Sequence, residues 1–153
     1  MDNEQINVIA NKIAQYRGVI IHDSISIEAM LGAIIAIYFV KDNKNNEFNR
    51  KVIDDEYFSF GLKIRVLEKL NFEVYSQFFE DIRRMNNIRN IFAHHVPTLD
   101  EGFIQQNSKD GKVETKYMSD LHKEFLEKIK KVDEQLHKIF FKVIEENKKE
   151  KEK

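Results

Sequence analysis

The chain has 153 residues, of which 42% are hydrophobic and 33% are charged, and its formal net charge is −1 at pH 7. This composition indicates one globular domain. The near-neutral net charge excludes the overall positive potential that is typical of a protein that coats nucleic acid. Because there is no cysteine, disulfides, zinc fingers and thiol nucleophiles are excluded. One proline and five glycines leave few chain breakers, which favours long helices.

The ends and the apolar runs bear on localisation. Residues 1–5 are polar and lack the basic-then-apolar order of a signal peptide. The longest apolar run, at residues 29–40, is shorter than the roughly 20 residues that a membrane helix needs. The sequence therefore predicts a cytoplasmic protein with no membrane segment.

Two helical patterns come first in the chain. One covers residues 3–17, and Gly18 marks a possible end or kink. The next runs from residue 19 or 23 to 40, and its apolar majority is typical of a helix at the centre of a bundle. Glu28 interrupts that majority. It is either an exposed surface carboxylate, the commoner case, or a neighbour of Arg89 or a histidine that tunes a site.

A polar, asparagine-rich segment at residues 41–49 is predicted to be a loop. A shorter helix fits residues 58–70, and Asn71 is expected to break it and to cap the next helix. That helix is predicted over residues 73–94, where large apolar side chains recur at helical spacing. Its inward positions are Tyr75, Phe78, Phe79, Ile82, Met85, Ile88 and Phe92.

The helical period stops after Pro97, the only proline. Residues 103–117 show no helical spacing, and Asp110-Gly111 between extended flanks indicates a small β-hairpin or a loop. Lysines in this segment are more often solvated loop charges than ligands for a phosphate chain. We expect a small insertion before the last helix.

The last helix is predicted over residues 119–146. Its apolar residues follow a heptad-like seam that is wide enough to indicate mainly intramolecular packing. The seam consists of Leu121, Phe125, Ile129, Val132, Leu136, Ile139 and Val143. The expected fold is an all-α bundle of about five helices in one domain, residues 1–147, followed by a charged frayed tail, residues 148–153.

The stretch at residues 86–95 combines chemistry with helical spacing. Asn86, Asn90 and His94 recur every four residues on one face, and Arg89 lies beside the apolar stripe. An arginine, an amide and an imidazole close together can hold a phosphate and move a proton. The commoner roles of such residues at a helix end are ion pairs, dipole partners and caps.

Residues 89–94, Arg-Asn-Ile-Phe-Ala-His, resemble the R-polar-x-x-x-H signature of the HEPN superfamily. The wider runs at residues 58–64 and 82–94 are similar to its mannitol-operon-repressor-like branch. The resemblance covers roughly residues 19–96. It implies an all-helical domain that dimerises and, in many members, cuts RNA without a metal or other cofactor.

In such a nuclease the RNA 2′-hydroxyl is the nucleophile. The resemblance implies His94 as general base or acid, Arg89 as the phosphate ligand and Asn90 as an orienting amide. His95, Asn86 and Glu28 are possible auxiliary residues. Arg89 and His94 point about 140° apart on a regular helix, so a two-fold partner would help to complete one site. A composite site at a homodimer interface is therefore expected.

Two points in this stretch leave alternatives open. His95 can replace His94 as the titrating group, although the motif ends at His94. Members of the family that pair with a nucleotidyltransferase antitoxin often carry a tyrosine two residues after the histidine, where this chain has Val96. This departure counts against that regulatory pairing, and another antitoxin or regulatory partner stays possible.

Other site classes fit less well. The five histidines are scattered without metal-binding spacing, the glycines are isolated, and a basic recognition helix is missing. Two hypotheses remain: a metal-independent endoribonuclease, acting as a toxin or phage-defence effector, or a non-catalytic regulatory or protein-interaction module. A catalytic arginine and histidine should be reachable from solvent, whereas structural ones should be buried and paired.

Overall fold

The computed structural model describes residues 3–40, 44–55, 57–98, 102–106 and 113–151. These residues form an all-α bundle with a small two-stranded sheet before the last helix, as the sequence predicted. In chain order the elements are α1 (Asn3–Phe39), α2 (Asn45–Phe48), the π-helical turn η1 (Asn49–Ile53), α3 (Phe60–Lys69), α4 (Phe78–His94), β1 (Gly102–Gln106), β2 (Val113–Tyr117) and α5 (Met118–Lys151).

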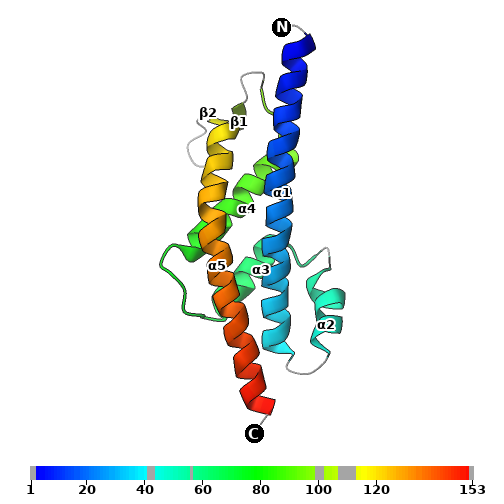
Figure 1. Cartoon of the computed structure of the whole chain (residues 1–153), viewed down its shortest axis with the longest axis vertical. Helices are drawn as coiled ribbons and strands as arrows, with labels where there is room; N and C mark the ends of the chain where they lie inside the picture. The colour runs from blue at the N-terminus through cyan, green and yellow to red at the C-terminus, as the bar shows by residue number, and fades with distance from the viewer. Residues whose placement is uncertain (1–2, 41–43, 56, 99–101, 107–112, 152–153) are drawn as a thin grey trace.

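Helices α1 and α5 form the long frame of the molecule and run side by side in the same direction (Figure 1). Near one end the ring of Tyr16 stacks on His122, with ring centroids 4.5 Å apart. Near the other end Asn147 Nδ2 donates a hydrogen bond of 2.9 Å to the carbonyl of Ile37. Helix α4 crosses this frame obliquely and packs against both long helices, and α3 packs against α1 and α4 (Figure 1).

The predicted end or kink at Gly18 is wrong, because α1 continues through it without interruption. A Cβ at Gly18 would meet nothing within 4 Å, so this glycine is required neither by a turn nor by close packing. A glycine inside a helix costs about 1 kcal/mol relative to alanine. Burial of Ile20, Ile27 and Leu31 in the core offsets that cost and keeps the helix continuous.

By length and composition, α1 is also apolar enough to cross a membrane. Its most apolar window of 18 residues has a mean hydropathy of 1.7, and 44% of that window is buried inside the bundle. The core helix of a soluble protein and a signal sequence near an N-terminus both pass the same test. The unbroken apolar run at residues 29–40 therefore understated the hydrophobic length of this helix.

The segment predicted as a polar loop, residues 41–49, is largely helical where it is described. Helix α2 and η1 run without a gap through residues 45–53. The turn η1 packs against α1 at Gly32, where a Cβ would lie 2.9 Å from Ile53 Cγ2. Ile53 anchors the segment by packing with Ile35 and Ala36 of α1.

Helix α3 lies close to its predicted position. Its N-terminus is capped by Ser59, whose Oγ accepts a hydrogen bond of 3.3 Å from the amide of Leu62. After its C-terminus Asn71 adopts a left-handed conformation with φ 55°. Helix α4 begins only at Phe78, with Gln77 at the N-cap position, so the expectation that Asn71 caps the fourth helix is wrong.

The main core lies where α1, α3, α4 and α5 meet, and the predicted inward face of α4 supplies much of it. The seam of α5 is buried or half-buried throughout, as predicted.

The antiparallel hairpin pairs Gly102 with Tyr117 and Gln106 with Val113, which confirms the insertion. Its predicted turn, Asp110-Gly111, lies outside the described residues. Helix α5 continues past the predicted end at residue 146, and the expected frayed tail is helical as far as Lys151.

Candidate functional site

The C-terminal turns of α4 have one buried side and one open side. Successive residues are about 100° apart, so the side chains around the helix can be ordered from their numbers. Met85, Ile88 and Phe92 are fully buried on the core side. The opposite side, which we call the α4 polar strip, runs from Arg89 at one edge across to His94 at the other and consists of Arg89, Asn86, Asn90 and His94.

Arg89 occupies the edge of the strip nearest to α1 and α3. Its Nη2 lies 3.8 Å from Glu28 Oε2 of α1, and its guanidinium lies 5.9 Å from the centre of the Phe60 ring of α3. The side chain is 29% exposed, and its buried Nε has no hydrogen-bond partner among the described residues. Arg89 therefore has one loose ion pair, an aromatic platform and an unused donor.

Glu28 is shared between two cations. Its Oε1 accepts a hydrogen bond of 3.1 Å from Lys63 Nζ of α3, while Oε2 faces Arg89. The Glu28 side chain is 20% exposed and that of Lys63 is only 5% exposed. Of the two alternatives for Glu28, the structure shows the one in which it lies next to Arg89.

Lys63 was not selected from the sequence, although a signal was present. Lys63 comes three residues after Phe60 and four residues before Leu67, so it lies on the same face of α3 as these two residues. Phe60, Leu67 and the neighbouring Ile64 are all buried. Leu62, the apolar residue just before Lys63, is 36% exposed. A lysine at an apolar-face position needs a buried counter-charge, and that requirement pointed to a carboxylate on a neighbouring helix.

The remaining strip residues are more open. Asn86 and Asn90 are half-buried, and Asn86 lies beside the first turn of α3, with its Nδ2 3.8 Å from the position of a Cβ at Gly61. His94 is exposed, and within the described part of the chain its imidazole makes no hydrogen bond or ion pair. The ring of His94 is therefore free to contact a ligand or a second protein.

His95 has a different position from His94, because the helix ends there. Its backbone is extended, and its carbonyl accepts a hydrogen bond of 2.8 Å from Arg17 Nη2 of α1. A cation at this point also complements the negative end of the helix dipole. Arg17 thus fixes the end of α4 immediately after the motif, and the imidazole of His95 is exposed.

The structure brings Arg89 and Glu28 together but does not bring Arg89 and His94 together. Helix α4 stays regular through His94, so the two side chains remain about 140° apart and separated by about 7.5 Å along the axis. One strip therefore presents a phosphate ligand at one edge and a proton carrier at the other. Both edges can serve one substrate only if a second surface faces the strip.

A cavity of about 300 Å³ opens beside Glu28 and Lys63. Among its described lining residues Lys63 is the only cation, and three carboxylate residues, Glu28, Asp54 and Asp55, also line it. Ile25, which also lines this cavity, is 56% exposed. Within the described residues no group of three histidine, aspartate or glutamate side chains is placed to hold a metal ion.

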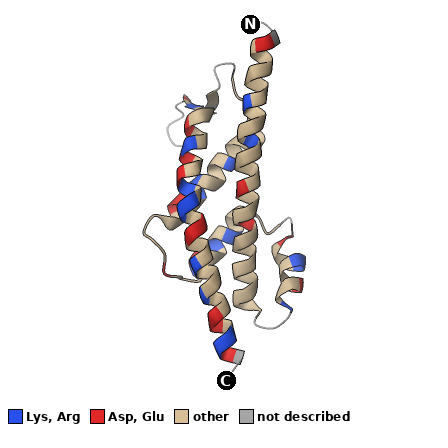
Figure 2. Cartoon of the chain, in the orientation of Figure 1, with Lys and Arg blue, Asp and Glu red and all other residues tan. Residues whose placement is uncertain are grey.

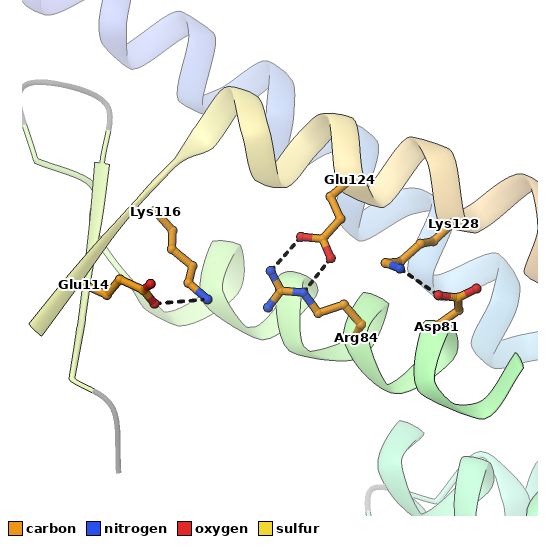
Figure 3. A network of polar contacts seen from close by, with 6 residues as sticks. All are labelled: Asp81, Arg84, Glu114, Lys116, Glu124 and Lys128. Carbon is orange, nitrogen blue, oxygen red and sulfur yellow. Dashed lines mark hydrogen bonds and ion pairs between the residues drawn. The ribbon is translucent and has the colours of Figure 1, made fainter. Parts of the chain in front are cut away.

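A second polar network joins α4 to α5 (Figure 3). Arg84 donates hydrogen bonds of 2.8 Å and 2.6 Å to the two carboxylate oxygens of Glu124, and these bonds lower the pKa of Glu124 and raise that of Arg84. Lys128 bonds Asp81 at 2.7 Å. Burial beside Asp81 raises the pKa of the Tyr75 phenol. Each cation here has a close carboxylate, so we interpret this network as a structural link between α4 and α5.

Charges are also unevenly distributed over the frame. Lysines, arginines, aspartates and glutamates alternate along α5, whereas α1 carries few charges (Figure 2). Glu28 is one of the few charged residues of α1, and it lies at the edge of the polar strip. The mixed surface of α5 offers no continuous basic track for a phosphate chain.

No protein-family model, no curated protein and no solved structure matches this chain.

Proposed function

We propose that the chain is a metal-independent endoribonuclease of HEPN type that acts as a homodimer, in the role of a toxin or phage-defence effector. The observation that supports this most directly is the α4 polar strip. It holds an arginine that is 29% exposed and lies 3.8 Å from Glu28, beyond hydrogen-bond distance, and a histidine whose ring is open to solvent. Both residues belong to the R-N-x-x-x-H signature.

The reaction uses the substrate's own nucleophile. A histidine takes the proton of the 2′-hydroxyl, the 2′-oxygen attacks the adjacent phosphorus, and the bond from phosphorus to the 5′-oxygen breaks. A second histidine protonates the leaving 5′-oxygen, so the products are a 2′,3′-cyclic phosphate and a 5′-hydroxyl. Arg89 stabilises the negative charge that develops on the phosphate oxygens, and Asn90 orients the phosphate.

A homodimer supplies the second surface that the strip lacks. If Arg89 of one subunit faces His94 of the partner subunit, two-fold symmetry produces the reciprocal pair as well. Two histidines are then available as base and acid around one cleft. Exposed Ile25 beside Glu28 is an apolar side chain that such an interface would cover.

The alternative is a non-catalytic regulatory or interaction module. It is favoured by the contact of Arg89 with Glu28 and with the Phe60 ring, since a structural arginine makes such contacts. In that case Arg89 ties α4 to α1 and α3, and the strip docks a partner protein or an antitoxin. His94 makes no hydrogen bond, ion pair or ring contact in the described part of the chain, so this alternative leaves it only the role of a helix-dipole partner in the last turn of α4.

The test is cleavage of several RNAs in EDTA by the wild type and by His94→Ala, with folding and dimerisation checked for both. We expect wild-type products with 2′,3′-cyclic phosphate ends, a loss of cleavage of about 100-fold or more in His94→Ala, and no cleavage of RNA with a 2′-deoxy group at the cut site. His137→Ala is the matched control, because His137 is an exposed histidine on α5 near Asp133. Absence of cleavage by a folded dimer would favour the interaction module.

A further inference from the structure

The two cations that share Glu28 hold it unequally. Lys63 makes a hydrogen bond of 3.1 Å to one oxygen, whereas Arg89 stays 3.8 Å from the other, beyond hydrogen-bond distance. The carboxylate is therefore held mainly by Lys63. Arg89 experiences a weaker attraction from a charge that is already largely compensated.

Burial explains why Lys63 holds the closer bond. Its side chain is 5% exposed, and a buried ammonium needs a counter-charge at hydrogen-bond distance. Packing of Phe60, Ile64 and Leu67 in the core fixes the turn of α3 that carries Lys63. Asp54 and Asp55 also line the neighbouring cavity, where Lys63 is the only cation among the described lining residues.

This division leaves the guanidinium of Arg89 with capacity for another anion. Its side chain is 29% exposed and stays beyond hydrogen-bond distance of Glu28, and the guanidinium lies 5.9 Å from the centre of the Phe60 ring. Without Lys63 the Glu28 carboxylate would have Arg89 as its nearest cation, and an arginine and a carboxylate form close, two-pronged hydrogen bonds. Arg89 would then be occupied by Glu28.

We infer that Lys63 is a positioning residue: by neutralising Glu28 it keeps Arg89 available to bind the phosphate of an RNA backbone. The identity of this ligand rests on the proposed function. The effect on the Arg89 guanidinium itself does not depend on RNA, so it can be measured separately.

The first experiment measures the dissociation constant for RNA that carries a 2′-deoxy group at the cut site. Lys63→Met should weaken binding by about tenfold to a hundredfold, the loss expected when a charged hydrogen bond to phosphate is removed. Adding Glu28→Gln to Lys63→Met should restore affinity to near the wild-type value, because the competing carboxylate is gone. Glu28→Gln alone should bind with nearly the wild-type affinity, because Lys63 already compensates this carboxylate.

Lys128→Met is the matched control. Lys128 also joins two helices through a close carboxylate, Asp81, but it lies in the network between α4 and α5. Loss of that ion pair tests whether destabilisation alone lowers RNA affinity. The RNA affinity of Lys128→Met should stay at the wild-type value. If Lys63→Met does not fold, the double variant with Glu28→Gln still decides, because weakened RNA affinity in that variant would contradict the inference.

The second experiment follows the Nε–H resonance of Arg89 by NMR, assigned through its absence in Arg89→Lys. Lys63→Met should shift this resonance as Glu28 moves onto the guanidinium, and the double variant should return it towards the wild-type position. An unchanged resonance in Lys63→Met would overturn the positioning role, whether or not RNA is cut. A shifted resonance in a chain that cuts no RNA would support the positioning role and overturn only the proposed nuclease.

Discussion

At the scale of single residues, the polar strip contains side chains with incomplete hydrogen bonding. Arg89 has an unused donor, and His94 has no partner within the described part of the chain. By contrast, Arg84 one helical turn and a half earlier is fully engaged with Glu124. The same helix thus carries one arginine that holds the fold together and one that has capacity for a ligand.

The sequence identified Arg89, Asn90 and His94 because a six-residue signature and a helical period were enough to place them on one helix. It could not decide the position of Glu28, since a carboxylate on an apolar helix is usually exposed. It missed Lys63 because the contact joins residues that are 35 positions apart. Only the packing of α3 against α1 brings this pair together.

The backbone at Asn71 supports a prediction about stability. Its φ of 55° is left-handed, a conformation that asparagine and glycine tolerate better than other residues. We expect Asn71→Ala to lower the free energy of unfolding by about 1 kcal/mol, while Asn71→Gly preserves or raises it. Urea denaturation of the three proteins measures the difference. Equal stability of the alanine and glycine variants would contradict the left-handed geometry.

At the scale of elements, long periodic helices were predicted better than their ends. The helices predicted from the apolar period of α4 and α5 are present, because their apolar faces are buried in one core. Gly18 and the asparagine-rich segment misled the prediction, because local propensity was overridden by packing against neighbouring helices. At residues 45–53 a single buried side chain, Ile53, holds polar helical turns in place.

The α4–α5 contact predicts how stability depends on pH. Hydrogen bonds from Arg84 hold the pKa of Glu124 below its usual value of 4.5, so the pair stabilises the fold above that value. The contribution is lost as the pH falls through the lowered pKa of the folded protein. Glu124→Gln should lower the free energy of unfolding at pH 7 by about 1 kcal/mol. The loss is this small because both side chains are partly exposed and solvent screens the pair.

Urea denaturation of the wild type and Glu124→Gln across pH 3 to 7 measures this dependence. The difference between the two proteins should shrink as the solution is acidified, since the glutamine does not titrate. A constant difference over that range would mean that packing, and not the charge of Glu124, accounts for the effect.

At the scale of the whole molecule, the all-α bundle and its hairpin were predictable from periodicity and turn signals. The assembly was not, because a single chain shows which side chains are open but not what faces them. Regular geometry through His94 keeps the two motif residues apart in one chain. The proposed nuclease therefore depends on a symmetric partner in a way that the interaction module does not.

The most direct test of the central claim mixes the wild type with an equal amount of His94→Ala under conditions in which subunits exchange. If the two His94 side chains of a dimer act as base and acid in one cleft, a dimer with a single His94 cannot cleave. Random exchange lowers the share of wild-type dimers from a half to about a quarter, so the rate of RNA cleavage in EDTA should fall to about half of its value before exchange. Mass spectrometry of intact dimers confirms the exchange. An unchanged rate in a fully exchanged mixture would contradict a site that uses both subunits.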